Sequence, residues 1–159
     1  MELKNYLINK ARKTPYFHLD GYMNRYWLVP YTNPKYVGCG MVKWYKQPLV
    51  WLIQKCGIAI RIHEILSSDA DRVFHDHPWD FVTVLLKGSY WENMPHGRFL
   101  RRQNSILYRK TTDRHSLELI ANQKVTTMFV TFKYKQKWGF WTSDTTKVPH
   151  EEYKNDSLS

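Results

Sequence analysis

Hydrophobic and less hydrophobic residues alternate along much of the second half of the chain, and this alternation predicts β-strands. Ile58, Ile60 and Ile62 stand at every second position, which is the period of a strand with one buried face. Further short segments rich in strand-forming residues follow at 72–77, 81–86, 89–92, 99–102, 105–109, 116–120, 126–133 and 138–142. Because no helical pattern separates them, their even spacing predicts an antiparallel β-sandwich or barrel.

The N-terminal third is patterned differently. Leu3, Tyr6 and Leu7 recur at helical spacing, so residues 2–13 predict a short amphipathic helix that ends before Pro15. Prolines and glycines then interrupt the chain, and the sequence predicts short strands only at residues 26–29 and 41–45.

These patterns divide the chain into three parts. We expect an N-terminal extension at residues 1–56 that packs on the main domain, a β-barrel at residues 57–142, and a polar tail at residues 143–159. A chain of 159 residues fits one domain.

Composition narrows the class of protein. The chain is 43% hydrophobic and 16% aromatic, which excludes disorder throughout. Its two cysteines cannot form a disulfide framework. No apolar run approaches the roughly 18–20 residues of a membrane span, and we see no signal peptide. We therefore expect a cytoplasmic protein without a membrane partner.

The net charge of +10 suggests a phosphate-bearing partner, although a solvated basic surface would also account for it. The partner could be a nucleic acid or a nucleotide-linked molecule. A nucleic acid is not favoured, since the lysines and arginines do not run together and no known binding motif is present.

Three histidines carry the strongest chemical signal. His75 and His77 are two residues apart in a predicted strand, so their side chains share a face and can reach one metal ion. His115 begins a later predicted strand and could supply a third ligand. The alternative is a set of barrel histidines that hydrogen-bond to their neighbours.

The spacing around these histidines resembles the cupin family. The first cupin motif, Gly-x5-His-x-His-x3-Glu-x6-Gly, aligns with His75, His77 and Gly88, and His115 resembles the histidine of the second motif. The resemblance covers residues 57–142 and implies a double-stranded β-helix, the jelly-roll barrel. The run from His75 to Trp79 and the run at residues 138–141 are similar to those of single-domain cupin-like proteins from bacteria and phages.

The chain departs from the motif at two positions in the first half. Asp69 stands where the motif has its leading glycine, and Phe81 stands where it has its metal-binding glutamate. The match to the second motif is weaker still, because Lys110, Thr112 and Leu119 stand at its proline, glycine and asparagine positions.

What remains is a possible site of three histidines, which resembles cupin-type thiol dioxygenases that bind ferrous iron without a carboxylate. Asp80 could replace the missing carboxylate if a β-bulge turned it inward.

Arg61 and His63 are candidate catalytic residues on the predicted strand that carries the isoleucines. If the isoleucines pack beneath the extension, Arg61 and His63 line the barrel; otherwise they face solvent. Inside the barrel, Arg61 could bind an anionic substrate group or pair with an acid such as Glu118, and His63 could act as a general base.

The sequence therefore predicts an all-β, cupin-like jelly-roll barrel with a short N-terminal helical extension. The expected function is that of a small metal-dependent enzyme, a non-haem iron oxygenase of a small polar and anionic substrate. Fe²⁺ is the favoured ion, with Zn²⁺, Mn²⁺ or Ni²⁺ as alternatives. Other interpretations are a metal-free epimerase or isomerase of a nucleotide sugar and a non-catalytic module that binds a small nucleotide. A homodimer is possible.

Overall fold

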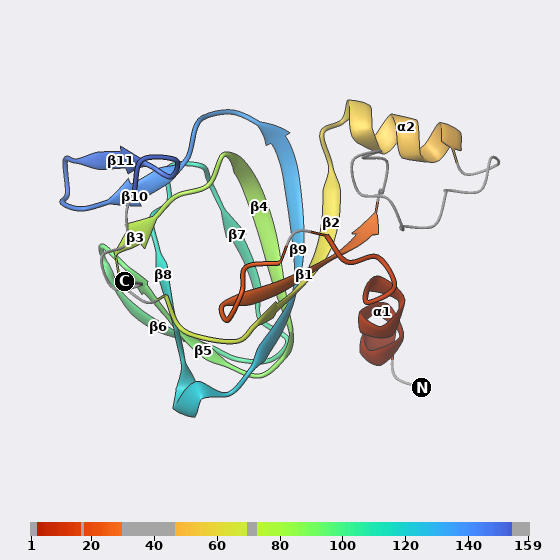
Figure 1. The fold of residues 1–159 in the computed structure, drawn as a ribbon, viewed down its shortest axis with the longest axis horizontal. Coiled ribbons are helices and arrows are strands. Elements are labelled where there is room, and N and C mark those ends of the chain that lie inside the picture. The colour runs from red at the N-terminus through yellow and green to blue at the C-terminus, as the bar shows by residue number, and fades with distance from the viewer. Residues whose placement is uncertain (1–2, 17, 30–46, 70–72, 154–159) are drawn as a thin grey trace.

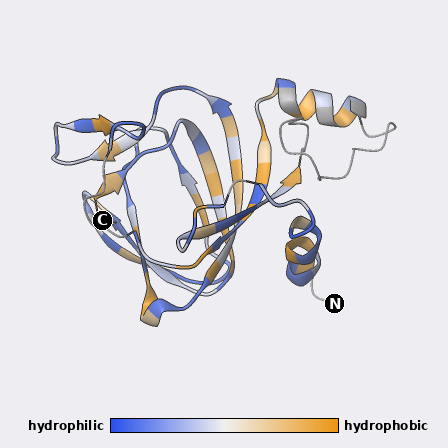
Figure 2. Cartoon of the chain, in the orientation of Figure 1, coloured by the Kyte–Doolittle hydropathy of each residue, from blue (hydrophilic) through white to orange (hydrophobic). Residues whose placement is uncertain are grey.

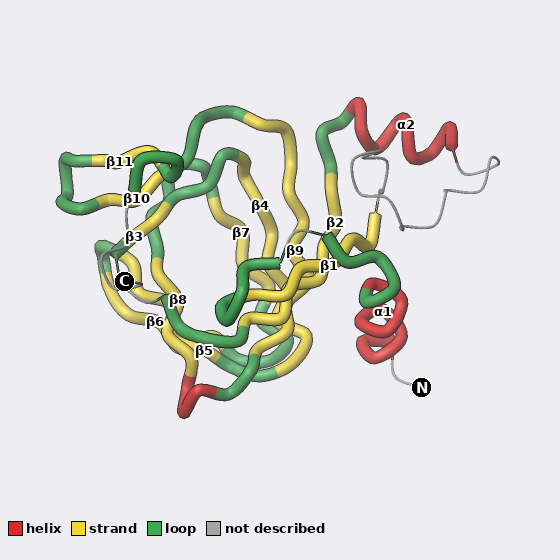
Figure 3. The backbone as a smooth tube through the Cα atoms, viewed as in Figure 1, coloured by secondary structure: helices red, strands yellow, loops and turns green. Residues whose placement is uncertain are grey.

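The structure, a computed structural model, describes residues 3–16, 18–29, 47–69 and 73–153. Strands dominate this part of the chain, and the helices are short (Figures 1 and 3). The elements run in the order α1 (Leu3–Ala11), β1 (Met23–Val29), α2 (Gln47–Lys55), β2 (Ala59–Ile65), β3 (Phe74–His75), β4 (Trp79–Lys87), β5 (Tyr90–Met94), β6 (Gly97–Arg101), β7 (Ile106–Arg109), β8 (Ser116–Leu119), the 3-10 helix η2 (Ile120–Asn122), β9 (Val125–Tyr134), β10 (Gly139–Trp141) and β11 (Lys147–Pro149).

The strands form three antiparallel sheets. One has five strands in the order β1-β2-β9-β4-β7, and two have three strands each, in the orders β11-β10-β3 and β6-β5-β8. A backbone bridge joins the two small sheets, since His75 and His115 each donate an N–H to the other's carbonyl oxygen at 2.9 and 3.0 Å. The five-stranded sheet and the two small sheets are thus opposite walls of one barrel (Figure 1). The predicted all-β jelly roll with a short N-terminal helix is confirmed.

The alternation along β2 separates the two faces of the five-stranded sheet. Ile62 is fully buried on the outer face, where it packs against Ile8 and Ala11 of α1. Both helices lie on the side of β1 and β2 (Figure 1). The same alternation is visible as changes of hydropathy along the strands in Figure 2. Of the two alternatives for the isoleucines, Ile62 therefore follows the one in which it packs beneath α1.

The inner face of the five-stranded sheet is apolar at one end of its strands and carries polar residues farther along them. At one end, Ile65, Leu85 and Val125 meet Tyr90 and Leu119 from the opposite wall in a hydrophobic cluster. Next along β2, on the same face, come His63 and then Arg61, since every second residue shares a face. The chemistry-bearing residues therefore lie beyond the apolar end of the barrel.

The N-terminal segment contributes more structure than the sequence predicts. β1 begins at residue 23 and pairs with β2 over most of its length, so it is a strand of the main sheet. The sequence does not predict helix α2, because Pro48 is among the prolines that interrupt the pattern. In the structure Pro48 lies in the first turn of α2, where proline is compatible with a helix. The strand predicted at residues 41–45 lies outside the described residues.

The C-terminal segment also contains an unpredicted strand. β11 lies in the segment predicted as a polar tail and pairs with β10. Its approach is so close that a Cβ on Gly139 would stand 2.2 Å from the carbonyl oxygen of Val148. Only glycine at this position permits the pairing.

Candidate metal centre

β3 and the residues after it place His75 and His77 on one face and Asp76 on the other. The two imidazole rings lie 5.1 Å apart between centroids. Asp76 is buried on the opposite side and fastens the β10–β11 hairpin to β3. Its carboxylate accepts hydrogen bonds from Gly139 N (2.9 Å), Trp141 Nε1 (3.2 Å) and Gln136 Nε2 (3.4 Å). It also forms an ion pair with Lys147 Nζ at 2.7 Å.

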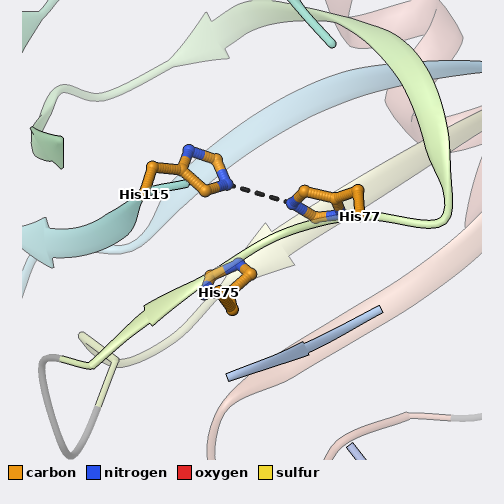
Figure 4. A group of neighbouring side chains, drawn as sticks. All are labelled: His75, His77 and His115. Atoms are coloured by element: carbon orange, nitrogen blue, oxygen red, sulfur yellow. Dashed lines mark hydrogen bonds between the residues drawn. The ribbon is translucent and has the colours of Figure 1, made fainter. Parts of the chain in front are cut away.

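The bridge between the small sheets brings His115 beside the other two histidines. His77 Nε2 and His115 Nε2 are 3.0 Å apart. One ring nitrogen from each of the three histidines lies within 4.8 Å of those of the others. Figure 4 shows the rings of His77 and His115 turned toward each other, with His75 beside them. The structure thus brings together the three residues predicted as metal ligands.

Glu92, which sequence analysis did not identify, fixes the orientation of His115. Its carboxylate is 1% exposed and accepts a hydrogen bond from His115 Nδ1 at 2.9 Å. The same carboxylate accepts hydrogen bonds from the guanidinium groups of Arg101 and Arg109. Because Nδ1 carries the proton, the lone pair of a neutral His115 is on Nε2, which faces His77.

The charge of Glu92 is stabilised despite its burial. Burial raises the pKa of this carboxyl, but hydrogen bonds from His115 and Arg109 outweigh that effect and lower the pKa to about 2. Glu92 is therefore ionised at neutral pH and holds His115 by a charge-assisted hydrogen bond.

Asp69 faces His75 in a similar way. Its Oδ2 is 3.7 Å from His75 Nδ1 and accepts a hydrogen bond from Leu117 N at 2.6 Å. The hydroxyl of Tyr22 donates to the other oxygen. Asp69 stands at the position of the motif's leading glycine, so this departure places a carboxylate behind a candidate ligand.

Phe81, at the position of the absent glutamate, forms an apolar wall. It is 2% exposed, and its ring centroid is 4.4 Å from that of His77 and 4.7 Å from that of Phe129.

Burial lowers the pKa of His77 well below 6.5, and the neighbouring histidines lower it further. His77 is therefore neutral at physiological pH, which is the form of imidazole that binds metal.

Asp80 does not replace the missing carboxylate. A register shift in β4 does occur at this residue. Its carboxylate nevertheless accepts hydrogen bonds from Thr111 N (3.0 Å), from the Tyr108 hydroxyl (3.1 Å) and from Lys135 Nζ. These partners hold Asp80 outside the group of three histidines, so the bulge that we considered does not turn it inward.

His63 lies on the same inner face, beside Phe129. The two rings stack with centroids 4.9 Å apart, and the ring of Phe129 is also 5.9 Å from that of His77. The hydroxyl of Tyr16 is 3.3 Å from His63 Nε2. Burial lowers the pKa of His63 well below 6.5, and the positive charges of Arg61 and Arg25 lower it further. His63 is neutral and able to accept a proton.

Arg61 is next to His63 on the inner face and is surrounded by aromatic rings. Its guanidinium carbon is 4.5 Å from the ring centroid of Trp27, 5.1 Å from that of Trp79 and 5.9 Å from that of Tyr16. Nη1 donates to Thr131 Oγ1 at 3.3 Å, whereas Nε is buried without an acceptor.

Glu118 is not the acid partner of Arg61. It forms an ion pair with Arg98 at 3.0 Å on the opposite wall of the barrel. Among the described residues, no carboxylate forms an ion pair with Arg61. Sequence parity alone could not exclude Glu118, because the pairing of β5, β6 and β8 decides its neighbours.

Aromatic side chains from the C-terminal hairpin lie beside His75. The ring centroids of Trp138 and Phe140 are 6.5 and 6.1 Å from that of His75. Phe140 stacks on Tyr153 and Trp138 stacks on His150.

In the part of the chain that the structure describes, no helix is long and apolar enough to cross a membrane.

No family model and no curated protein matches this sequence. Among solved structures, a cupin-2 domain containing protein from Shewanella frigidimarina matches with a TM-score of 0.41 and 10% identity, over 48% of this chain and 71% of that chain. The DMSP lyase DddQ from Ruegeria pomeroyi matches with a TM-score of 0.43 and 12% identity, over 62% of this chain and 45% of that one. HppE in its apo form matches with a TM-score of 0.48 and 10% identity, over 74% and 54%.

This chain spans about half the length of the last two proteins. Of these three proteins, the one from Shewanella frigidimarina is described as containing a cupin-2 domain. At identities and TM-scores this low, the matches concern the fold and do not transfer any ligand or reaction to this chain.

Proposed function

We propose that this chain is a small metal-dependent enzyme of the cupin type, a non-haem iron oxygenase that acts on a small polar substrate. The observation that carries the proposal is the convergence of ring nitrogens from His75, His77 and His115. Three protein ligands leave coordination positions open for water, substrate or O₂, which is the arrangement of a catalytic metal site.

The geometry of the three histidines fits a divalent ion. Two nitrogens that each lie about 2.1 Å from one ion at a right angle are about 3.0 Å apart. His77 Nε2 and His115 Nε2 are separated by 3.0 Å. The hydrogen bond to Glu92 leaves the lone pair of His115 on Nε2. The nitrogens of His77 and His115 are therefore spaced as two ligands of one ion, and His115 presents its lone pair to that position.

Fe²⁺ is the ion that we favour, and Zn²⁺, Mn²⁺ or Ni²⁺ would also bind neutral imidazoles. Phe81 fills the position of the cupin glutamate, and Asp80 is held elsewhere, so the described residues supply no carboxylate to this group. A site of three histidines resembles the ferrous site of cupin-type thiol dioxygenases. When bound, Fe²⁺ would supply one-electron and O₂ chemistry that amino-acid side chains lack.

The chain's own residues would position the substrate and limit access of water. Phe81 and Phe129 present apolar rings beside His77. His63 is neutral, buried and on the same face of the sheet, so its Nε2 could accept a proton from a substrate. The hydroxyl of Tyr16 is 3.3 Å from this nitrogen and could exchange a proton with it.

One observation also fits a metal-free protein. A separation of 3.0 Å between His77 Nε2 and His115 Nε2 would equally result from a direct N–H···N hydrogen bond between two neutral rings. In that case His63 would act as the base of an epimerase or isomerase, or the barrel would only bind a small nucleotide. Metal analysis distinguishes these functions.

The first test is the metal content of protein produced without a polyhistidine tag. We expect about one equivalent of bound divalent metal in the unmodified protein. His115→Ala should lose most of it, because two imidazoles hold an ion weakly. His96→Ala is the matched control, since His96 is exposed and lies outside the group. Full occupancy in His115→Ala would contradict the assignment of the third ligand.

The second test addresses the oxygenase part of the proposal. Protein loaded anaerobically with Fe²⁺ is exposed to nitric oxide, which binds ferrous sites that have an open position and gives a distinctive EPR signal. We expect that signal in the unmodified protein and in His96→Ala but not in His77→Ala. A loaded protein that gives no signal would have no open position for O₂, and the oxygenase function would be wrong.

A further inference from the structure

The partners of Arg61 differ from those of four other arginines. Arg12 pairs with Glu64, Arg98 pairs with Glu118, and both Arg101 and Arg109 pair with Glu92. Arg61 has no such acid among the described residues, although it is less exposed than Arg98. An arginine that is removed from water without an anion is costly, so its position calls for a functional explanation.

The free edge of this guanidinium suits an anion with two or more oxygens. Nη1 is already engaged with Thr131, but Nε has no acceptor and is buried. Carboxylate and phosphate groups bind arginine through two parallel N–H···O bonds, and the edge that carries Nε can form such a pair. The rings of Trp27, Trp79 and Tyr16 lie around the guanidinium group.

A second guanidinium group, that of Arg25, acts on Arg61. The guanidinium carbon of Arg25 lies 4.9 Å from the ring centroid of Tyr16, which also contacts Arg61. Burial lowers the pKa of Arg61, and the positive charge of Arg25 lowers it further. An oxyanion bound here would relieve the repulsion between the two guanidinium groups.

We propose that the Nε edge of Arg61, within the rings of Tyr16, Trp27 and Trp79, binds the oxyanion group of a small carboxylate- or phosphate-bearing substrate. Because residues two apart on a strand are about 7 Å apart, the next part of that substrate would lie over His63. The inference rests on the proposed function for one detail only, which is that the far end of the substrate reaches the three histidines.

The partner is a small molecule rather than a nucleic acid. Arg61 lies on the inner face of the five-stranded sheet among the rings of Trp27 and Trp79, whereas the backbone of a polynucleotide binds arginines on an exposed surface. The overall charge of +10 would still attract polyanions to the surface without involving Arg61.

The test measures binding of acetate and of inorganic phosphate to chelator-treated protein at constant ionic strength, by calorimetry and by thermal stability. Removal of metal ensures that the anion does not bind an ion at the histidines. We expect saturable binding of at least one of the two anions, and the preferred anion tells a carboxylate site from a phosphate site. Arg61→Gln should weaken that binding at least about tenfold, the effect of losing one charge-assisted hydrogen-bond pair.

Arg98→Gln is the matched control. Arg98 also stacks on a tryptophan, with its guanidinium carbon 4.4 Å from the ring of Trp91, but it has an acid partner. This variant should bind the anion as the unmodified protein does. If Arg61→Gln does not fold, Arg61→Lys provides the test, because lysine keeps the charge but lacks the planar edge.

Three results would overturn the inference. They are equal anion affinity in the Arg61 variants and the unmodified protein, binding of neither anion, and an equal loss in Arg98→Gln. Metal analysis of the same samples keeps the two proposals separate. If the protein binds metal but neither anion, only the inference about Arg61 is wrong. If anion binding depends on Arg61 but the protein never takes up metal, only the metal-dependent function is wrong.

Discussion

At the scale of single residues, Glu92 accepts hydrogen bonds from three side chains: His115, Arg101 and Arg109. Arg101 comes from the neighbouring strand β6, Arg109 from β7, and His115 from the residue before β8. Its carboxylate therefore orients a candidate metal ligand and neutralises two arginines at once. Carboxylates behind ligating histidines contribute to metal affinity because they fix the tautomer and the orientation of the ring.

We predict that Glu92→Gln weakens metal binding by about 10- to 100-fold. The substitution should also lower the free energy of unfolding by about 3–5 kcal/mol, because it leaves two arginines without their buried partner. Competition with a metal chelator and urea titration measure the two effects. Glu118→Gln is the control, since it breaks only the exposed pair with Arg98 and should cost less than about 1 kcal/mol. Unchanged metal affinity in Glu92→Gln would show that Glu92 has only a structural role.

At the scale of elements, helix α1 is held on the outer face of the sheet by apolar packing and by a charged contact. Ile8 and Ala11 are buried against the sheet, and Arg12 donates to the carboxylate of Glu64 on β2. Burial raises the pKa of Glu64, but the hydrogen bonds from Arg12 and Tyr26 lower it by more. The pKa of Glu64 in the folded protein is therefore below the ordinary 4.5.

This shift predicts a pH dependence of stability. Because the folded protein holds Glu64 ionised, the stabilisation is complete above pH 4.5 and is lost as the pH falls through the lower pKa of the folded state. We expect Glu64→Gln to be less stable than the unmodified protein at neutral pH, and the difference to shrink in acid. Urea titrations at a series of pH values measure this, and a difference that does not change with pH would argue against the ionised pair.

The elements also show what the sequence could and could not predict. The alternation of Ile58, Ile60 and Ile62 predicted the strand β2, and the parity of His75 and His77 predicted their shared direction. The alternation did not show that both faces of β2 are buried at its C-terminal end. The pairing of β1 with β2 was not predictable, because these strands are far apart in the chain and their alignment depends on tertiary packing. The partners of Glu92 follow from the alignment of four strands, which no local pattern specifies.

At the scale of the whole molecule, the two faces of the five-stranded sheet have separate tasks. The outer face is covered by α1 and carries Ile62, while the inner face carries His63 and Arg61. Substitutions on the outer face should therefore change stability without changing the chemistry of the inner face.

Ile62→Ala tests this separation. Ile62 is 0% exposed, so we predict a loss of about 3 kcal/mol in the free energy of unfolding, with unchanged metal content in the folded protein. Ile106→Ala is the control, since Ile106 is 71% exposed and should change stability by less than about 0.5 kcal/mol. A large loss of metal in folded Ile62→Ala would show that the two faces are coupled.

Anomalous X-ray diffraction from crystals loaded with Fe²⁺ tests the central claim most directly. With data collected at the iron absorption edge, the proposal predicts one strong anomalous peak within bonding distance of a ring nitrogen from each of His75, His77 and His115. A peak at another place, or a map in which His77 Nε2 and His115 Nε2 remain in direct contact with no peak between the rings, would contradict it.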